Sequence, residues 1–146
     1  MNLQIREMTS NDKLEVLSMM KEFYSSDAVS TNGSEEIFNN DFDNCINNNP
    51  YLKGFVFYSN NTIGGYAMIA KSFSTEFGKP CIWFEDLYLK PEFRGFGIIP
   101  SFIEYIKQNY PECIYRLEVE KENTHAVYVY KKQGFSKLPY TEMKLL

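Results

Sequence analysis

Residues 85–99 of the chain read EDLYLKPEFRGFGII, an apolar run that passes through a basic, glycine-rich turn into a second apolar run. The first run is typical of a strand buried on both faces, and the residues after the turn follow helical spacing. Glycine lets the backbone approach a ligand, a helix start offers free N–H groups, and Arg94 adds a permanent cation. This combination suits a pyrophosphate, and an ordinary surface turn is the alternative explanation.

A second stretch, residues 117–135, reads LEVEKENTHAVYVYKKQGF and predicts a strand, an Asn-led turn, a short helix and a glycine stop. Together the two stretches resemble the GCN5-related N-acetyltransferase (GNAT) superfamily. The positions that match the pattern of that family in the second stretch are Asn123, Ala126, Tyr130, Gly134 and Phe135. The resemblance covers roughly residues 80–146, whereas the N-terminal half agrees only in the order of its elements.

The bulk properties fit one folded domain over residues 1–146. The chain has a mass of 17.1 kDa, with 44% hydrophobic and 23% charged residues, which is a globular rather than a disordered composition. The resemblance implies a mixed α/β (α+β) fold with a single GNAT-type domain. Its central, mostly antiparallel sheet is expected to have about six to seven strands, to splay at strands 4 and 5, and to be flanked by about four helices.

Apolar periodicity and turn signals predict the individual elements. Helices are expected from Leu14 to Tyr24, from Ser34 to Ile46, through Phe102 to Asn109 and from Thr124 to Gln133, with Ser10 or Asn11 capping the first. Strands are expected around Leu3 and Ile5, at residues 54–58, 62–70, 81–89 and 114–119, and as a last pair at 135–138 and 141–146. Residues 59–61, Ser-Asn-Asn, predict a hairpin turn because Asn tolerates a positive φ.

Charge and cysteine content exclude several classes of protein. The net charge of −4, without a long basic block, argues against nucleic-acid binding. Cys45, Cys81 and Cys113 form an odd set without a C-x-x-C pair, which argues against a disulfide framework or a zinc site. No apolar run reaches membrane-spanning length. We therefore expect a soluble, cytoplasmic protein without metal, membrane or nucleic-acid partner, and a homodimer is possible because many relatives are dimers.

The resemblance implies acetyl-CoA as co-substrate. Backbone groups of Leu87 and Leu89 would bond the pantetheine arm, which would lie between the splayed strands. The residues carried over to the pyrophosphate turn are Arg94, Gly95, Phe96, Gly97, Ile98 and Ile99. The chain departs from the family pattern at Ile99, where Gly or Ala is usual, and at Pro100, which has no N–H to donate.

Transfer to an amine needs a base for the amine and an acid for the departing thiolate. The resemblance assigns the base to Glu85 and the acid to Tyr130, whose phenol is neutral at pH 7. Asp86 points to the opposite face of a regular strand and is the lesser candidate unless a β-bulge re-aims it. Asn123 is expected to hold backbone and cofactor amides near the splay, to cap the following helix, or both. His125, the one histidine, is expected to be an exposed bystander.

The acceptor is suggested by charge. Residues 22–52 contain six acidic side chains and no Lys or Arg, and in relatives this helical region roofs the acceptor site. We therefore expect a cationic small-molecule amine, polyamine-like or aminoglycoside-like, and the stretch from Trp83 to Gly97 is similar to diamine and polyamine acetyltransferases. Two solvated helix faces would explain the same acidic residues.

Two other functions stay open at this point. One is a non-catalytic acyl-CoA-binding module, which the departures at Ile99 and Pro100 would suit. The other is an acetyltransferase that acts on a lysine or the N-terminus of a protein or peptide.

Overall fold

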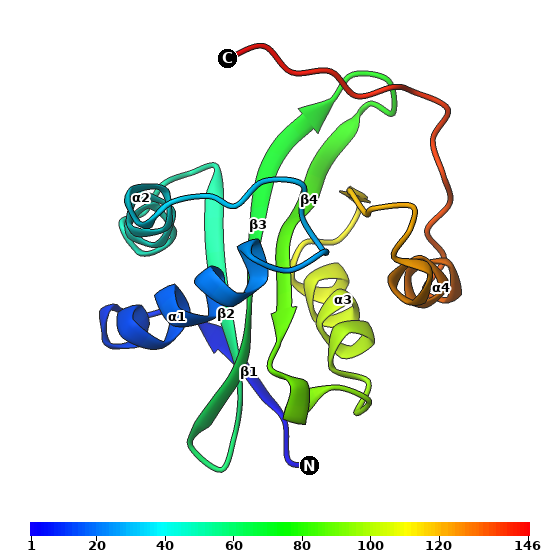
Figure 1. Ribbon diagram of the computed structural model, residues 1–146. Coiled ribbons are helices and arrows are strands. Elements are labelled where there is room, and N and C mark those ends of the chain that lie inside the picture. Colours follow the sequence, from blue (N-terminus) through cyan, green and yellow to red (C-terminus); the bar gives the residue numbers. More distant parts are fainter.

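The computed structural model describes residues 1–146, which form one twisted sheet with helices on both faces (Figure 1). The sheet order is β1-β2-β3-β4-β5. The strands are β1 (Gln4–Glu7), β2 (Leu52–Ser59), β3 (Thr62–Ser74), β4 (Lys79–Leu89) and β5 (Ile114–Leu117), and the α-helices are α1 (Lys13–Tyr24), α2 (Glu35–Ile46), α3 (Ile98–Asn109) and α4 (Thr124–Lys132). The fold is thus mixed α/β with four α-helices, as the sequence predicts, and none of these helices is long and apolar enough to cross a membrane.

Helices α1 and α2 cover one face of the sheet, where their apolar stripes bury Val16, Met19, Met20, Phe38 and Phe42. The Ser34 hydroxyl caps α2 by accepting from the Ile37 N–H at 3.2 Å. The predicted cap of α1 is wrong, because residues 10–12 form a short 3₁₀ turn ahead of the helix. Asp12 there accepts from the Thr9 N–H at 2.8 Å and pairs with Arg6, whose hydrogen bonds hold the pKa of Asp12 below its usual range.

Strands β2 and β3 form the expected antiparallel hairpin. Its turn residues Asn60 and Asn61 have φ angles of 51° and 63°. This left-handed pair matches the twist of the hairpin, and Asn adopts it at low cost.

The opposite face of the sheet packs on α3. Phe102 is fully buried there and its ring lies 5.1–5.9 Å from those of Phe55, Phe57 and Phe84. After β4, a 3₁₀ turn at Pro91–Phe93 presses the Phe93 ring onto Gly64, where a Cβ would lie only 2.2 Å from the ring. The ring occupies the space that a Cβ would take, so only glycine permits this contact. The contact fixes the course of the chain as it leaves β4 for the glycine-rich turn.

Strands β4 and β5 pair in parallel, over all of β5 but only near the start of β4. The pairing runs from Cys81 with Ile114 to Phe84 with Leu117, while β4 continues to Leu89. Its edge facing β5 therefore has no strand partner from Glu85 to Leu89. This is the splay that the resemblance implies at strands 4 and 5.

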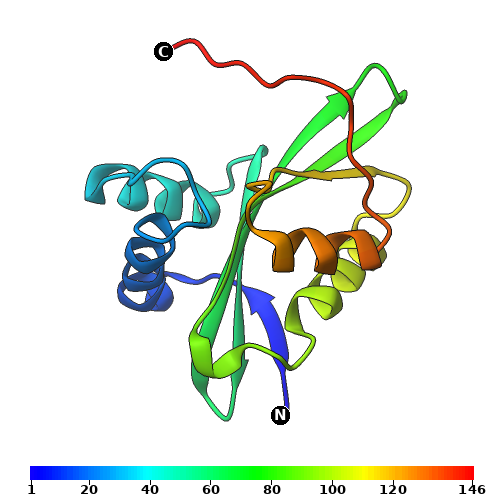
Figure 2. The same cartoon turned by 45° about the vertical axis from the view of Figure 1, so that its right-hand side comes forward.

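The sheet has five strands instead of the expected six to seven, because the predicted last pair does not form. Residues 136–146 are extended but make no backbone–backbone hydrogen bond, and they run from α4 past the β3–β4 hairpin to its other side (Figures 1 and 2). Strand β5 also ends two residues before the predicted Val119. Alternating apolar residues therefore give these segments strand character, but no neighbouring strand satisfies their backbone groups.

Candidate active site

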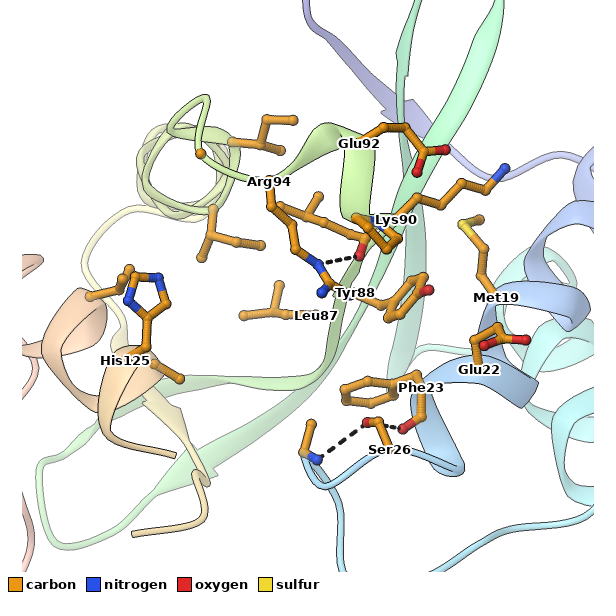
Figure 3. A pocket seen from close by; sticks show the side chains of 18 of the residues that line it. Met19, Glu22, Phe23, Ser26, Leu87, Tyr88, Lys90, Glu92, Arg94 and His125 are labelled. Carbon is orange, nitrogen blue, oxygen red and sulfur yellow. Dashed lines mark hydrogen bonds between the residues drawn. The ribbon is translucent and has the colours of Figure 1, made fainter. Parts of the chain in front are cut away.

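A cavity of about 800 Å³ opens beside the unpaired end of β4. It lies between α1, the end of β4 with its turn into α3, and α4 (Figure 3). Met19, Glu22 and Phe23 line it from α1, and His125 lines it from α4. Of the predicted cofactor residues, it is lined by Leu87, Leu89, Arg94, Gly95, Gly97, Ile98, Ile99 and Tyr130. Phe96, Asn123 and Glu85 are not among its lining residues.

The glycine-rich turn at the cavity wall has the form of an anion site. Gly95 and Gly97 have φ angles of 84° and 71°, which residues with a side chain rarely adopt. The N–H groups of Ile98 and Ile99 have no backbone acceptor, because they belong to the first turn of α3. Free N–H groups at a helix start bind phosphate oxygens, so the turn fits a pyrophosphate.

Arg94 supplies the cation of this turn. Its Nε donates to the Leu89 carbonyl at 3.0 Å and its guanidinium lies 6.0 Å from the centre of the Tyr88 ring (Figure 3). Arg94 forms no ion pair with a carboxylate, so its terminal N–H groups remain available for an anionic ligand. Phe96, the predicted contact in the same turn, is 58% exposed.

The departure from the family pattern leaves the helix intact. Pro100 occupies the third position of α3, where its missing N–H interrupts no helical hydrogen bond. Ser101 already donates to the Gly97 carbonyl at 3.1 Å. The Ile99 side chain packs against the core below α3. The turn therefore loses one donor to Pro100 but keeps those of Ile98 and Ile99.

A β-bulge separates the two predicted base candidates. Met68 of β3 stands opposite Asp86, and the next residue, Ile69, stands opposite Phe84, so Glu85 is the extra residue. The bulge turns Asp86 toward α1, while the apolar residues Leu87 and Leu89 stay on the α3 side. The β-bulge that would re-aim Asp86 is therefore present.

Asp86 is buried and held by two phenols. The Tyr24 hydroxyl donates to one carboxylate oxygen and the Tyr66 hydroxyl to the other, each at 2.8 Å. Burial raises the pKa of Asp86 against the opposing effect of these hydrogen bonds, and no cation pairs with it. Asp86 is therefore a fixed negative group between α1 and the sheet rather than an accessible base.

Other carboxylates gather around this point. Burial and the nearby charge of Asp86 raise the pKa of Asp41, on α2, to about 6. Burial also raises the pKa of Glu85, and the charges of Asp86, Glu142 and Asp41 add to that shift. None of these side chains takes part in an ion pair of the chain. The arrangement leaves negative charge without a cationic partner where β4 and β5 separate.

Tyr130 and Asn123 come from opposite ends of α4. The Tyr130 hydroxyl has no hydrogen-bond partner in the chain. Burial raises the pKa of Tyr130 to about 12. It is therefore protonated at neutral pH and free to donate to a ligand in the cavity. The Asn123 side chain accepts from the Ala126 N–H at 3.3 Å and so caps α4.

Two lining residues, His125 and Phe23, were given no role by the sequence. His125, expected to be an exposed bystander, is exposed and borders the cavity (Figure 3). Phe23 lines the opposite wall beside Glu22, one of the six acidic residues of the segment 22–52. The loop after α1 is tied across the splay, because the Ser30 hydroxyl donates to the Glu120 carboxylate beyond β5.

Comparison with known proteins places this geometry in context. The sequence profile of the acetyltransferase (GNAT) family matches residues 16–135. A possible acetyltransferase from Clostridium difficile 630 has a TM-score of 0.81 at 19% identity, over 99% of this chain and 97% of that chain. A predicted acetyltransferase from Clostridium acetobutylicum, solved with acetyl-CoA, has a TM-score of 0.75 at 21% identity, over 97% and 96%.

A third similar structure is AAC(6')-Iy in complex with the bisubstrate analog CoA-S-monomethyl-acetylneamine. Its TM-score is 0.80 at 15% identity, over 100% of this chain and 99% of that chain. At these identities the likeness concerns the fold. No curated protein sequence matches the chain.

Proposed function

The chain belongs to the acetyltransferase (GNAT) family of acetyl-CoA-dependent N-acetyltransferases, and from that premise we propose that its acceptor is the primary amine of a cationic small molecule. The observation that carries this proposal is the set of unpaired carboxylates at the splay, Asp41, Glu85 and Asp86. Burial raises the pKa of each of these carboxylates, nearby negative charge adds to the shift for Asp41 and Glu85, and a bound ammonium would supply the missing cation.

The acidic residues predicted to attract the acceptor are not equivalent. Asp43 is already neutralised by Lys13 at 3.1 Å, whereas Asp41, two residues earlier on α2, faces Asp86. Glu22 lines the cavity from α1. We therefore assign cation attraction to Asp41, with Glu22 as a second group, and treat Asp43 as structural. The AAC(6')-Iy structure, which holds a CoA-linked aminoglycoside derivative in a similar fold, supports this class of acceptor.

For the co-substrate, the proposal uses the cavity between α1, β4 and α4. The pyrophosphate would lie against Arg94 and the free N–H groups of Ile98 and Ile99. Leu87 and Leu89 would offer backbone groups from the unpaired strand edge, as a neighbouring strand would. The thioester, which supplies the activated acetyl group, would then lie near the splay.

The chemical step is assigned to two side chains. Glu85 takes a proton from the acceptor ammonium, directly or through water, and its raised pKa brings it nearer to neutral pH than an ordinary carboxylate. The free amine attacks the thioester carbon, the carbon–sulfur bond breaks, and the Tyr130 hydroxyl donates its proton to the thiolate. The nitrogen releases its second proton as the amide forms, and this proton restores the Tyr130 phenol. Asp86 holds Tyr24 and Tyr66 in place and stays out of proton transfer.

The test is an amine panel assayed with acetyl-CoA by release of the CoA thiol. Putrescine, spermidine, an aminoglycoside and lysine peptides are compared with butylamine, which matches putrescine in length but carries one amine. We expect the dicationic amines to give the higher kcat/KM. Equal kcat/KM for butylamine and putrescine would contradict the proposal that the acceptor carries a second positive charge. CoA binding without transfer to any amine would favour the non-catalytic acyl-CoA-binding module.

A pair of variants tests the assigned carboxylate. Asp41→Asn is expected to lower kcat/KM for putrescine about tenfold, or about 1.4 kcal/mol, and to leave that for butylamine within about twofold. Asp43→Asn, on the same helix but paired with Lys13, is the matched control and should act equally on both amines.

A further inference from the structure

The turn between β4 and α3 contains two phenylalanines with different surroundings. Phe93 is buried in the core and packs on Gly64. Phe96, three residues later, is 58% exposed and belongs to neither core. Because Phe93 and the buried Ile98 already anchor the turn at its two ends, the Phe96 ring is not needed to hold it in place. The ring is therefore available to a ligand.

Phe96 lies on a part of the turn that projects from the body of the molecule. Its neighbours Gly95 and Gly97 both have positive φ, and a Cβ at either position would meet no atom beyond the adjacent residues within 4 Å. Figure 1 shows this turn at the lower edge of the molecule, between the end of β4 and the start of α3. A ring on a short turn that is anchored at both ends loses little conformational freedom when a ligand covers it.

The ring is close in the chain to the groups assigned to the pyrophosphate of CoA. Phe96 follows Arg94 by two residues and precedes Ile98, whose N–H has no backbone acceptor, by two. Gly95 and Gly97 line the cavity, whereas Phe96 does not, so its side chain lies outside the cavity. In CoA the pyrophosphate joins the pantetheine arm to an adenosine. With the arm in the cavity and the pyrophosphate on the turn, the adenosine lies outside the cavity as well.

An exposed aromatic ring suits the adenine base of this adenosine. The base is uncharged at neutral pH and presents a flat π face, which stacks on aromatic side chains. Of the two basic side chains that line the cavity, Lys90 is paired with Glu15 at 3.3 Å and Arg94 is assigned to the pyrophosphate. The Phe96 ring gives the base a partner that needs no charge.

We propose that the adenine base of CoA stacks on the Phe96 ring. Phe96 then acts as a positioning residue, because it holds the nucleotide end of the co-substrate outside the cavity while the pantetheine arm occupies the cavity. The inference rests on the placement of the pyrophosphate at Arg94 and the start of α3, which is part of the proposed function. It is independent of the acceptor amine, since the adenosine is at the end of CoA opposite the thioester.

The first experiment compares two ligands, CoA and 4′-phosphopantetheine, which is the part of CoA without the adenosine. NMR chemical-shift titrations of the full chain measure both dissociation constants, including values in the millimolar range. Phe96→Ala is expected to raise the dissociation constant of CoA about tenfold and to leave that of 4′-phosphopantetheine within about twofold. Phe73→Ala, at a similarly exposed position on β3, is the matched control and should change neither. Equal effects of Phe96→Ala on both ligands, or an unchanged affinity for CoA, overturn the proposal.

Arg94→Ala separates a failure of the stacking from a failure of the pyrophosphate placement. This variant should weaken the binding of both ligands, because each carries a phosphate that would lie on the turn. If Arg94→Ala weakens both ligands and Phe96→Ala weakens neither, only the stacking is overturned. If Arg94→Ala weakens neither, the pyrophosphate lies elsewhere and both proposals are wrong.

Fluorescence gives a direct readout of the stacking. In Phe96→Trp the new indole should be quenched by CoA and unaffected by 4′-phosphopantetheine. The wild type, whose one tryptophan is Trp83, supplies the background signal. Absence of quenching by CoA would also overturn the proposal. None of these measurements uses enzymatic activity, so the result does not depend on which amine is the acceptor.

Discussion

The two parts of the molecule on either side of residue 106 differ sharply in packing. All 29 buried residues lie between Met8 and Ile106, and 21 of them form the two cores on opposite faces of the sheet. From Lys107 onward no residue is buried, although this part holds β5, α4 and the segment 136–146. The first part is a finished scaffold, whereas the second has its elements in place without a core of its own.

This difference divides the proposed chemistry between a rigid and a loosely packed part. Glu85 and the buried Asp86 belong to the scaffold, while Tyr130 and Asn123 come from α4. The cavity lies where the two parts meet. Leu117, Tyr130 and Phe135 pack on the core of the first part from its edge, and we infer that bound ligands strengthen this partial packing.

The largest effect is expected from core truncation in the scaffold. Phe102→Ala removes a fully buried ring that contacts four other aromatic rings, and it should lower the free energy of unfolding by about 3–5 kcal/mol. Phe135→Ala, in the loosely packed part, removes a half-buried ring and should cost about 1–2 kcal/mol. Urea titrations of both variants measure the contrast, and equal losses would contradict it.

Removal of one hydroxyl should affect catalysis without affecting stability. Tyr130→Phe is expected to lower kcat about 100-fold or more, about 2.7 kcal/mol, because the acid for the thiolate is lost. CoA affinity and the melting temperature should change little, since that hydroxyl has no partner within the chain. Tyr128→Phe, at a 62% exposed position on the same helix, is the control. Retention of wild-type turnover in Tyr130→Phe would assign the proton donor elsewhere.

Cofactor binding should reduce the difference between the two parts. CoA at 100 times its dissociation constant stabilises the folded state by about 2.7 kcal/mol. Hydrogen exchange should slow more in β5 and α4 than in the β2–β3 hairpin, whose backbone is already protected. Uniform slowing over the whole chain would argue that the second part is no looser than the first.

The smallest effect concerns the pH dependence of stability. The pKa of Asp41 is about 6 in the folded protein and about 3.9 in an unfolded chain, so the folded state binds the proton more tightly. Stability is therefore lost as the pH rises from about 4 to about 6, by about 1 kcal/mol after allowance for the half-exposed side chain. Asp41→Asn should abolish this loss in urea titrations at several pH values, and Asp43→Asn should preserve it.

The order of elements and the glycine-rich turn could be predicted from sequence, because they depend on local signals. Periodicity placed all four α-helices, and Asn60 with Asn61 marked the hairpin turn. Residues 136–146 were predicted as strands because local alternation reports strand propensity, whereas pairing depends on a partner that the sequence of one chain does not display.

The site was predictable where its geometry is local to one element. Arg94 lines the cavity from the predicted turn, and Tyr130, whose place at the cofactor the resemblance to the GNAT family implied, lines it from α4. The contacts of Asp86 with Tyr24 and Tyr66 were not predictable, because they join residues 62 and 20 positions apart. One local signal for the bulge did exist, since the apolar residues of β4 at 82, 84, 87 and 89 are spaced by two, three and two.

The single additional residue in β4 lets one strand present acidic groups on one face and apolar side chains on the other. A strand without a bulge sends alternate side chains to the same face along its whole length. The positions of the acidic residues and of the apolar residues in β4 would then depend on each other. With the insertion at Glu85, acidic groups can be swapped, shortened or neutralised while Ile82, Phe84, Leu87 and Leu89 stay in phase against α3. If Glu85 were instead paired in a regular strand without the bulge, the alternation would turn Asp86 toward α3 and Leu87 and Leu89 toward α1.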